Sequence, residues 1–179
     1  MADKLLRKAK SCDPNKILCK KLVGSLTLNV YTDASFANLR DMGSQRGSIG
    51  FISDSAERSN LLEYKSKKIK KVCRSTFAAE LLACTAALDH TLSYKSIIEA
   101  FGLKVASIYI VTDNNGLRDN LSSLVSTCEE KSLRIELAYL RETLSAEGIK
   151  VRWVRGSEQL ADVLTKEKAG LDVLNFLSS

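Results

Sequence analysis

Four acidic residues stand at the ends of predicted strands and helices, and together they have the chemistry of a metal site. They are Asp33, Glu80, Asp113 and Asp162. Two of them, Asp33 and Asp113, follow apolar runs typical of buried strands, and a sheet would bring both to one edge. Carboxylates gathered there repel one another unless cations lie between them, and Mg²⁺ is usually held in proteins by a few carboxylates, waters and substrate phosphates. The group therefore indicates a metal-dependent enzyme that cuts phosphodiester bonds.

The order of the predicted elements shows how one fold can bring these acids together. Strands are predicted over residues 26–33, 47–53, 61–67, 105–112 and 149–154, and helices over 75–100, 117–125, 129–147 and 157–164. The order β-β-β-α-β-α-α-β-α predicts a five-stranded mixed sheet flanked by helices, in the α/β class. Ligands of such sheets gather beyond the carboxyl ends of the parallel strands, where Asp33 and Asp113 would project.

The two longest helices are predicted from apolar side chains that recur every three or four residues. The first carries Phe77, Leu81, Cys84 and Leu88, and the second carries Leu133, Leu137, Leu140 and Leu144. Ser75 or Thr76 is expected to cap the first helix, and Gly148 to end the second.

Length and composition are those of one globular domain, which we expect to be flanked by an N-terminal extension and a C-terminal tail. The chain has 179 residues, 45% of them hydrophobic and 27% charged. Residues 25–167 are expected to form the domain, after a basic extension over 1–24 that resembles a connecting segment, and before a tail over 168–179 with a short helix at 171–177. A further short helix is predicted at residues 4–10.

Cysteine and histidine usage excludes several kinds of site. The five cysteines are an odd number without a C-x-x-C pair, and one histidine, His90, cannot complete a zinc finger or a metal site with several histidines. A Ser-His-Asp or Cys-His triad would have to be built around this single residue. We predict reduced thiols, with Cys84 in the core. Because no apolar run is long enough to span a bilayer and the first residues are charged, we expect no membrane partner and a cytoplasmic or nuclear location.

Basic side chains are unevenly spread, and one run precedes a candidate metal ligand. The net charge is +6, and the run that leads to Glu80 contains Lys65, Lys67, Lys68, Lys70, Lys71 and Arg74. Such clusters suit a polyanion, although a charge run is also typical of an ordinary solvated face. Its position beside a candidate metal ligand favours the polyanion.

The local phrases around the acids resemble those of the ribonuclease H fold, and more narrowly those of the ribonuclease H domain of Ty1/copia-type retrotransposon polyproteins. The phrases are residues 31–37, 66–68, 74–80, 112–114 and 160–166, and the last, LADVLTK, is typical of the end of the family's polymerase polyprotein. The resemblance covers about residues 25–167.

The resemblance implies a function and a role for each acid. Asp33 would bridge two Mg²⁺ or Mn²⁺ ions, Glu80 and Asp113 would complete one site, and Asp162 would complete the other. Many cellular relatives also have a histidine shortly before the fourth acid, and here residues 154–158 contain none. If that histidine helps the product to leave, the resemblance implies slower turnover here, or a Glu158 that takes its place.

The implied substrate is an RNA/DNA hybrid, and the implied partner is an attached reverse transcriptase. Ser35, Asn114, Asn115 and the backbone of residues 47–50 are candidates for the RNA strand, while the Lys65–Arg74 run would hold phosphates of the DNA strand. Asn114 is equally suited to a turn. Two other functions stay open: a catalytically silent module that binds nucleic acid or packs against a polymerase, and a nuclease of the same fold that acts on DNA, such as a resolvase or integrase.

Overall fold

A single five-stranded sheet organises the protein. The computed structural model describes residues 19–123, 128 and 130–166. The strand order is β3-β2-β1-β4-β5, with β1 at Leu26–Ser35, β2 at Gln45–Asp54, β3 at Ser59–Lys68, β4 at Val105–Thr112 and β5 at Lys150–Trp153. The first three strands are antiparallel neighbours, and β4 and β5 run parallel to β1. The predicted five-stranded mixed sheet is confirmed.

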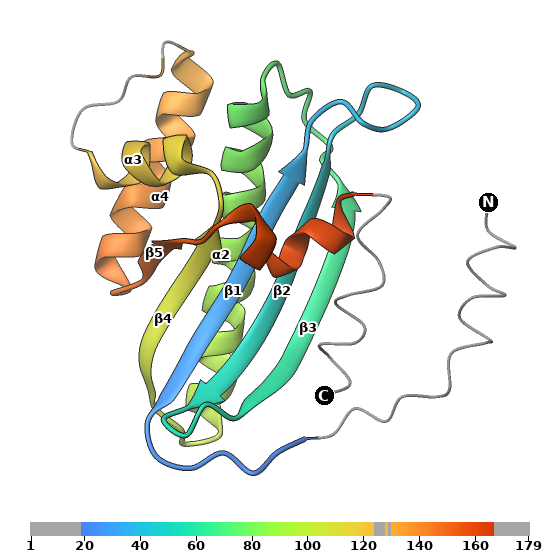
Figure 1. Cartoon of the computed structure of the whole chain (residues 1–179). Helices are drawn as coiled ribbons and strands as arrows, with labels where there is room; N and C mark the ends of the chain where they lie inside the picture. The colour runs from blue at the N-terminus through green and yellow to red at the C-terminus, as the bar shows by residue number, and fades with distance from the viewer. Residues whose placement is uncertain (1–18, 124–127, 129, 167–179) are drawn as a thin grey trace, which may run out of the picture.

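The helices cover the sheet on one side of its central strands. Helix α2 (Thr76–Ala100) packs along β1, and α4 (Lys131–Ala146) packs against α2, with the short α3 (Asn115–Ser122) near both (Figure 1). The Ser75 side chain accepts a hydrogen bond from the Ala78 N–H, so the predicted cap is confirmed. Gly148, with a φ of +64°, follows the end of α4 in the left-handed conformation expected of such a residue.

Both predicted helical stripes face the core. Leu81, Cys84 and Leu88 of α2 are fully buried against Leu28 and Val30 of β1. In α4 the buried residues are Leu137, Leu140 and Leu144, while Phe77 and Leu133 are partly buried against the same cluster. None of the described cysteines, Cys19, Cys73, Cys84 and Cys128, forms a disulfide.

The last predicted helix is two short 3₁₀ segments, η1 at Gly156–Glu158 and η2 at Leu160–Leu164. The reason is tertiary. The Gln159 amide donates to the Thr32 carbonyl at 3.0 Å, and side chains of Gln45 and Ser66 donate to the Leu164 carbonyl at 2.9 and 2.6 Å. Because both ends of η2 are tied to the sheet within a few residues, the tighter helix fits where a full α-helix would not.

Not all predicted segments fall in the described part of the chain. The expected helices at 4–10 and 171–177, and the tail over 168–179, lie outside the described residues. Of the predicted extension over 1–24, residues 19–24 are described: the Val23 N–H donates to Asp54, and Lys20 exchanges two hydrogen bonds with Asn60. Among the described helices, none has the length and apolar character needed to cross a membrane.

Candidate metal centre

Asp33 lies at the end of the central strand and on the sheet face away from α2. Alternate residues of β1 point to opposite faces, and Leu28 and Val30 face α2. Asp33 therefore projects to the other face, beside η2, where the Thr165 hydroxyl donates to its Oδ2. Only 2% of Asp33 is exposed.

Glu80 approaches Asp33 from the first turns of α2. The Ser75 cap fixes where the helix begins, and Glu80 follows five residues later with 5% of its surface exposed. Helix α2 starts at the same sheet end at which β1 finishes (Figure 1), so its first turns meet the carboxyl end of that strand. Glu80 and Asp33 are far apart in the sequence, and the packing of α2 on β1 brings them together.

Asp113 follows β4, the parallel neighbour of β1. It is partly exposed, and its surroundings hold the backbone in place: the Trp153 indole N–H donates to the Asp113 carbonyl at 2.9 Å, and the Asn114 N–H donates to Thr112 Oγ1 at 3.1 Å. Because β1 and β4 are parallel and adjacent, their carboxyl ends deliver Asp33 and Asp113 to the same edge.

These three acids converge on a common point. Asp33, Glu80 and Asp113 each offer a carboxylate oxygen, and the three oxygens lie within 4.8 Å of one another. Burial, followed by the charges of Asp33 and Asp113, raises the pKa of Glu80 from 4.5 to about 8. Burial also raises the pKa of Asp33 to about 6, against a lowering effect of the Thr165 hydroxyl. Such raised pKa values in a cluster of named partners are typical of functional sites.

Asp162 joins the group from η2, beside Asp33. It is partly buried, with 20% of its side chain exposed, and its charge contributes to the raised pKa of Asp33. Lys166 lies over the same acids: its Nζ is 2.6 Å from Asp162 Oδ2. Burial opposes the charge of Lys166, but the hydrogen bond and ion pair with Asp162, and the charges of Asp33 and Asp113, raise its pKa overall.

The donor set fits a hard divalent cation. Glu80 Oε2 and Asp162 Oδ1 are buried oxygens without a hydrogen-bond partner among the described residues. A buried oxygen left without a partner costs free energy, and a cation that takes oxygen ligands would satisfy both atoms. The four acids predicted from the sequence are thus at one place, three in a tight group and Asp162 beside them.

Close packing at Gly47 holds η2 against the sheet and gives a testable prediction. A Cβ on Gly47 would lie 2.8 Å from Leu164 Cβ and 3.0 Å from the Ala161 carbonyl oxygen. We expect Gly47→Ala to push η2, with Asp162 and Thr165, away from Asp33. The apparent affinity for Mg²⁺, measured as the rise in melting temperature with Mg²⁺ concentration, should fall by roughly 10- to 100-fold, as for loss of groups that orient metal ligands.

Gly50→Ala is the matched control for that substitution. Gly50 is in the same strand, and its added Cβ would meet the Tyr94 ring at 3.0 Å rather than η2. It should lower the melting temperature by overpacking and leave the Mg²⁺ titration midpoint unchanged. Equal Mg²⁺ affinity in both variants would contradict the assigned role of Gly47.

The predicted nucleic-acid residues are only partly gathered around the metal centre. Ser35 ends β1 and Asn115 is exposed at the start of α3, both within two residues of a metal-site acid. Asn114 Oδ1 accepts the Leu117 N–H at 2.8 Å, so in the structure this side chain caps the start of α3. Glu158 is exposed in η1, whose Gly156 faces Asp113: a Cβ there would lie 3.5 Å from Asp113 Oδ2.

The predicted basic run does not form one continuous surface. Lys65 and Lys67 face α2 from β3, Lys68 pairs with Asp41 on the β1–β2 loop, and Lys71 lies 3.6 Å from Glu136 of α4. Lys70 and Arg74 are exposed in the segment between β3 and α2. Strand alternation sends neighbouring lysines to opposite faces, which a simple count of charges does not show.

The sequence did not reveal the supporting role of four residues, although the backbone of one of them, Gly47, was a candidate for contacts with the RNA strand. Thr165 and Lys166 contact the acids, Gln159 ties η2 to β1, and Gly47 admits η2 to the sheet. Thr165 and Lys166 lie in the LADVLTK phrase, which was a usable signal. Gln159 and Gly47 carry no local signal, because their importance comes from contacts across the sheet.

In sequence, the chain is similar to a segment of two retrotransposon polyproteins. It is 26% identical over 139 residues to the retrovirus-related Pol polyprotein from transposon TNT 1-94 of Nicotiana tabacum, covering 78% of this chain. It is also 26% identical over 167 residues to that from transposon RE1 of Arabidopsis thaliana, covering 92% of this chain. The chain spans only 10% and 11% of these polyproteins. No protein-family model matches the chain.

Solved structures with a similar fold are ribonucleases H. A ribonuclease H1 isolated from compost has a TM-score of 0.58 and 16% identity, with 82% of this chain and 98% of that chain covered. The same enzyme in complex with an RNA/DNA hybrid has a TM-score of 0.57 and 16% identity, with 76% and 92% covered. The ribonuclease H domain of prototype foamy virus has a TM-score of 0.54 and 17% identity, with 79% and 93% covered.

These likenesses agree with the geometry of the site. At such identities the solved structures establish the fold, and the sequence relatives establish the kind of polyprotein that contains a similar segment. The chain therefore has the ribonuclease H fold and is related in sequence to Ty1/copia-type Pol polyproteins of plant retrotransposons, which confirms the predicted resemblance.

Proposed function

We propose that the chain is an endoribonuclease that hydrolyses the RNA strand of RNA/DNA hybrids with two bound divalent cations. The observation that carries the proposal is the convergence of Asp33, Glu80 and Asp113, whose oxygens lie within 4.8 Å of one another at the carboxyl end of β1 and β4. The ribonuclease H fold and the Pol relatives support the substrate class.

The chemistry follows from where the acids lie. Two divalent cations, when bound, supply a metal-activated water and stabilise the leaving oxygen of the scissile phosphodiester. Asp33 is at the centre of the group and would contact both ions. Glu80 and Asp113 would hold one of them, and Asp162 would hold the other from η2. No protein nucleophile is needed, in keeping with a chain whose single histidine, His90, is on α2.

Each supporting contact has a task in this scheme. The Thr165 hydroxyl orients Asp33, and the Gln159 amide fixes η2 so that Asp162 stays beside Asp33. Lys166 neutralises Asp162 at 2.6 Å, and cation binding would release its ammonium toward the substrate phosphates. Ser35 and Asn115 are exposed or partly exposed beside Asp33 and Asp113, where 2′-hydroxyls of an RNA strand would be recognised.

The hybrid and the polymerase partner are proposals drawn from the relatives. The compost ribonuclease H1 has been solved with an RNA/DNA hybrid, and a similar fold in this chain suits the same duplex. Because the match covers only 10% and 11% of retrovirus-related Pol polyproteins, we propose that a reverse transcriptase of such a polyprotein is the partner of this chain.

The decisive experiment is cleavage of hybrids with a labelled RNA strand, with Mg²⁺ or Mn²⁺, resolved on a denaturing gel. We expect fragments of the RNA strand, none in excess EDTA, and none from duplex RNA or duplex DNA. A folded protein that binds hybrid without cutting it, and is not stabilised by either metal, would instead be a silent module. Cleavage of duplex DNA would favour the nuclease of the same fold that acts on DNA.

A further inference from the structure

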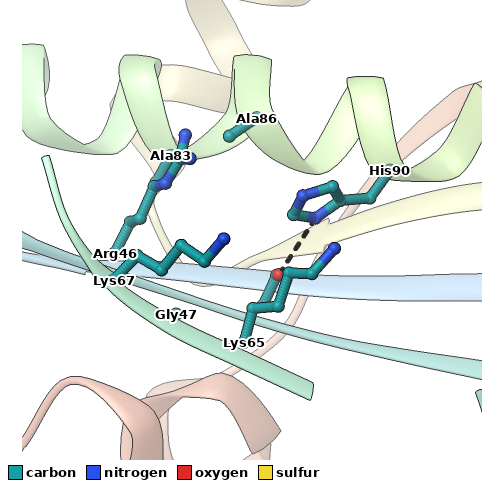
Figure 2. Close-up of a pocket in the computed structure, with 8 residues that line it drawn as sticks. Arg46, Gly47, Lys65, Lys67, Ala83, Ala86 and His90 are labelled. Carbon is teal, nitrogen blue, oxygen red and sulfur yellow. Dashed lines mark hydrogen bonds between the residues drawn. The ribbon is translucent and has the colours of Figure 1, made fainter. Parts of the chain in front are cut away.

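A second basic feature lies on the other face of the sheet, between α2 and the β2–β3 edge. We call it the basic hollow: a shallow, open depression with Arg46 of β2, Lys65 and Lys67 of β3, and Ala83, Ala86 and His90 of α2 in its lining. Figure 2 shows the Arg46, Lys65 and Lys67 side chains rising from the strands toward α2. Gly47 and Ser48 complete the lining, and none of the charged side chains of the hollow belongs to the metal centre.

Strand register and small helix residues explain why the hollow exists. Ala34, Arg46 and Lys67 are successive partners across β1, β2 and β3, so their side chains share the face on which α2 lies. Ala83 and Ala86 present only methyl groups to this edge, which leaves space between helix and strands (Figure 2). Longer side chains at these two positions would fill it.

The hollow has more positive charge than its surroundings neutralise. Lys65 pairs with Glu63 at 2.8 Å. Among the described residues, neither Arg46 nor Lys67 takes part in an ion pair. Two like charges held side by side repel each other, so a bound anion would lower the energy of this arrangement. A guanidinium with a nearby ammonium is a common way to hold a phosphate group.

His90 completes the wall as a neutral hydrogen-bonding group. Burial, and then the charge of Lys65, lowers the pKa of His90, with Arg46 acting in the same direction and Glu63 and Asp89 opposing. The ring shares a hydrogen bond with Ser48 at 3.4 Å through Nδ1, the dashed line in Figure 2. The histidine therefore adds no permanent charge, and the three cations dominate.

We infer that the basic hollow binds a backbone phosphate of the nucleic acid held at the metal centre, which rests on the proposed function. The hollow and Asp33 are at the same end of the sheet, although on opposite faces: Ala34, which follows Asp33, pairs with Arg46, and Arg46 pairs with Lys67. Two strand spacings amount to about 10 Å. A nucleic acid held at the metal centre covers such a distance within a few nucleotides, so the contacted phosphate would flank the scissile one.

The lining specifies the class of contact. Arginine and lysine side chains bind phosphate oxygens without reading base edges, so the hollow would position the nucleic acid rather than select a sequence. It also differs from the single basic surface predicted from residues 65–74. The hollow contains two lysines of that run, together with Arg46 and His90. Lys68 and Lys71 lie outside it and pair with Asp41 and Glu136.

The first test measures hybrid binding in EDTA, so that cleavage plays no part. Fluorescence anisotropy of a labelled RNA/DNA hybrid is recorded over a range of salt concentrations for the wild type and for Arg46→Gln/Lys67→Gln. We expect binding about tenfold weaker and a salt slope smaller by about 0.9, because the variant neutralises one phosphate fewer. Lys104→Gln/Lys150→Gln is the matched control, because both lysines are exposed at the amino ends of β4 and β5.

A second variant separates the hollow from surface charge in general. Ala86→Leu keeps all the cations and fills the space, and it should reduce the salt slope as the charge variant does. Thermal unfolding checks the fold of each variant, and if Ala86→Leu does not fold, the charge variant decides alone. A folded Arg46→Gln/Lys67→Gln protein with the slope of the control pair would overturn the inference, even if the wild type cuts hybrids.

Two further measurements identify the ligand of the hollow and its position along the hybrid. The next test uses hybrids with one uncharged methylphosphonate linkage placed at successive positions. We expect one linkage near the cut whose neutralisation weakens binding by the wild type but not binding by Arg46→Gln/Lys67→Gln. Inorganic phosphate is the small-anion probe. If it binds in an Arg46-dependent way while hybrid binding is the same in wild type and variant, the hollow is a small-anion site and the nucleic-acid assignment is wrong. A protein that never cuts but shows the Arg46-dependent slope would support the hollow and reject the nuclease.

Discussion

Glu80→Gln should abolish hybrid cleavage and, in the same protein, raise the melting temperature measured without metal. Cleavage should fall on the order of 1000-fold or more, since metal ligation supplies several kcal/mol to the transition state and each tenfold is about 1.4 kcal/mol. Stability should rise because Glu80 is 5% exposed, its Oε2 has no partner in the described structure, and its pKa is raised to about 8 by burial and by Asp33 and Asp113. A neutral amide removes the repulsion.

Opposite changes in activity and stability separate a functional acid from a structural one. The matched control is Glu99→Gln, an exposed acid on the same helix, which should leave both cleavage and melting temperature nearly unchanged. The measurements are initial cleavage rates with Mg²⁺ and thermal unfolding in EDTA at pH 8. A Glu80→Gln protein that melts well below the wild type would show that the carboxylate stabilises the fold, and the metal assignment would lose its main electrostatic support.

Without metal, the protein should become less stable as the pH rises from about 5 to 8, and Mg²⁺ should reverse the loss at pH 8. The sign follows from two carboxyls with raised pKa values in the folded state. The pKa of Asp33 is raised from 3.8 to about 6 and the pKa of Glu80 from 4.5 to about 8, and burial is the largest cause of both shifts. Between these limits the folded state binds more protons than the unfolded state, so deprotonation favours unfolding as the pH rises.

Mg²⁺ should restore stability at pH 8 because it binds the deprotonated acids of the folded state. A ligand at about 100 times its Kd stabilises the folded state by about 2.7 kcal/mol, and the effect of Mg²⁺ should be smaller at pH 5, where protons compete for the same oxygens. Thermal unfolding at both pH values, with Mg²⁺ or with EDTA, measures it. His90 works in the opposite direction because burial lowers its pKa, so the informative quantity is the difference between wild type and Glu80→Gln, which should show the flatter profile.

If the wild type and Glu80→Gln had the same pH profile in EDTA, the raised pKa of Glu80 would be wrong. If Mg²⁺ stabilised both equally at pH 8, the ion would be bound elsewhere. Neither result would affect the basic hollow, whose binding is measured without metal.

Local sequence patterns predicted the elements because their causes are local. The stripe of Leu81, Cys84 and Leu88 predicted one face of α2, and that face is buried. Ser75 predicted the helix start, since a cap needs only a side-chain oxygen and the N–H groups of the next turn. The η2 segment shows the limit: its sequence is compatible with an α-helix, and its 3₁₀ form comes from Gln45, Ser66 and Gln159, which are distant in sequence or tied to distant carbonyls.

In the candidate site, too, some features were predictable from local sequence and others depend on contacts between distant elements. The four acids were predicted because each ends an element or follows a family phrase, and parallel strands deliver their carboxyl ends to one edge. The basic run from Lys65 to Arg74 was predicted as one surface, but alternation along β3 and partners on other elements divide it. Arg46 was not among the predicted residues, because its neighbours Lys65 and Lys67 come to it only through the β2–β3 register.

The sequence by itself determined the kind of chemistry: acidic residue types, their order, and the strands and helices on which they lie. Only the tertiary structure decided how close the oxygens of Asp33, Glu80 and Asp113 come, that Gly47 lets η2 bring Asp162 to them, and that Arg46 joins Lys65 and Lys67 under α2. The physical reason is range. Backbone periodicity and capping act over a few residues, whereas carboxylate repulsion, close packing and side-chain direction depend on which strands become neighbours.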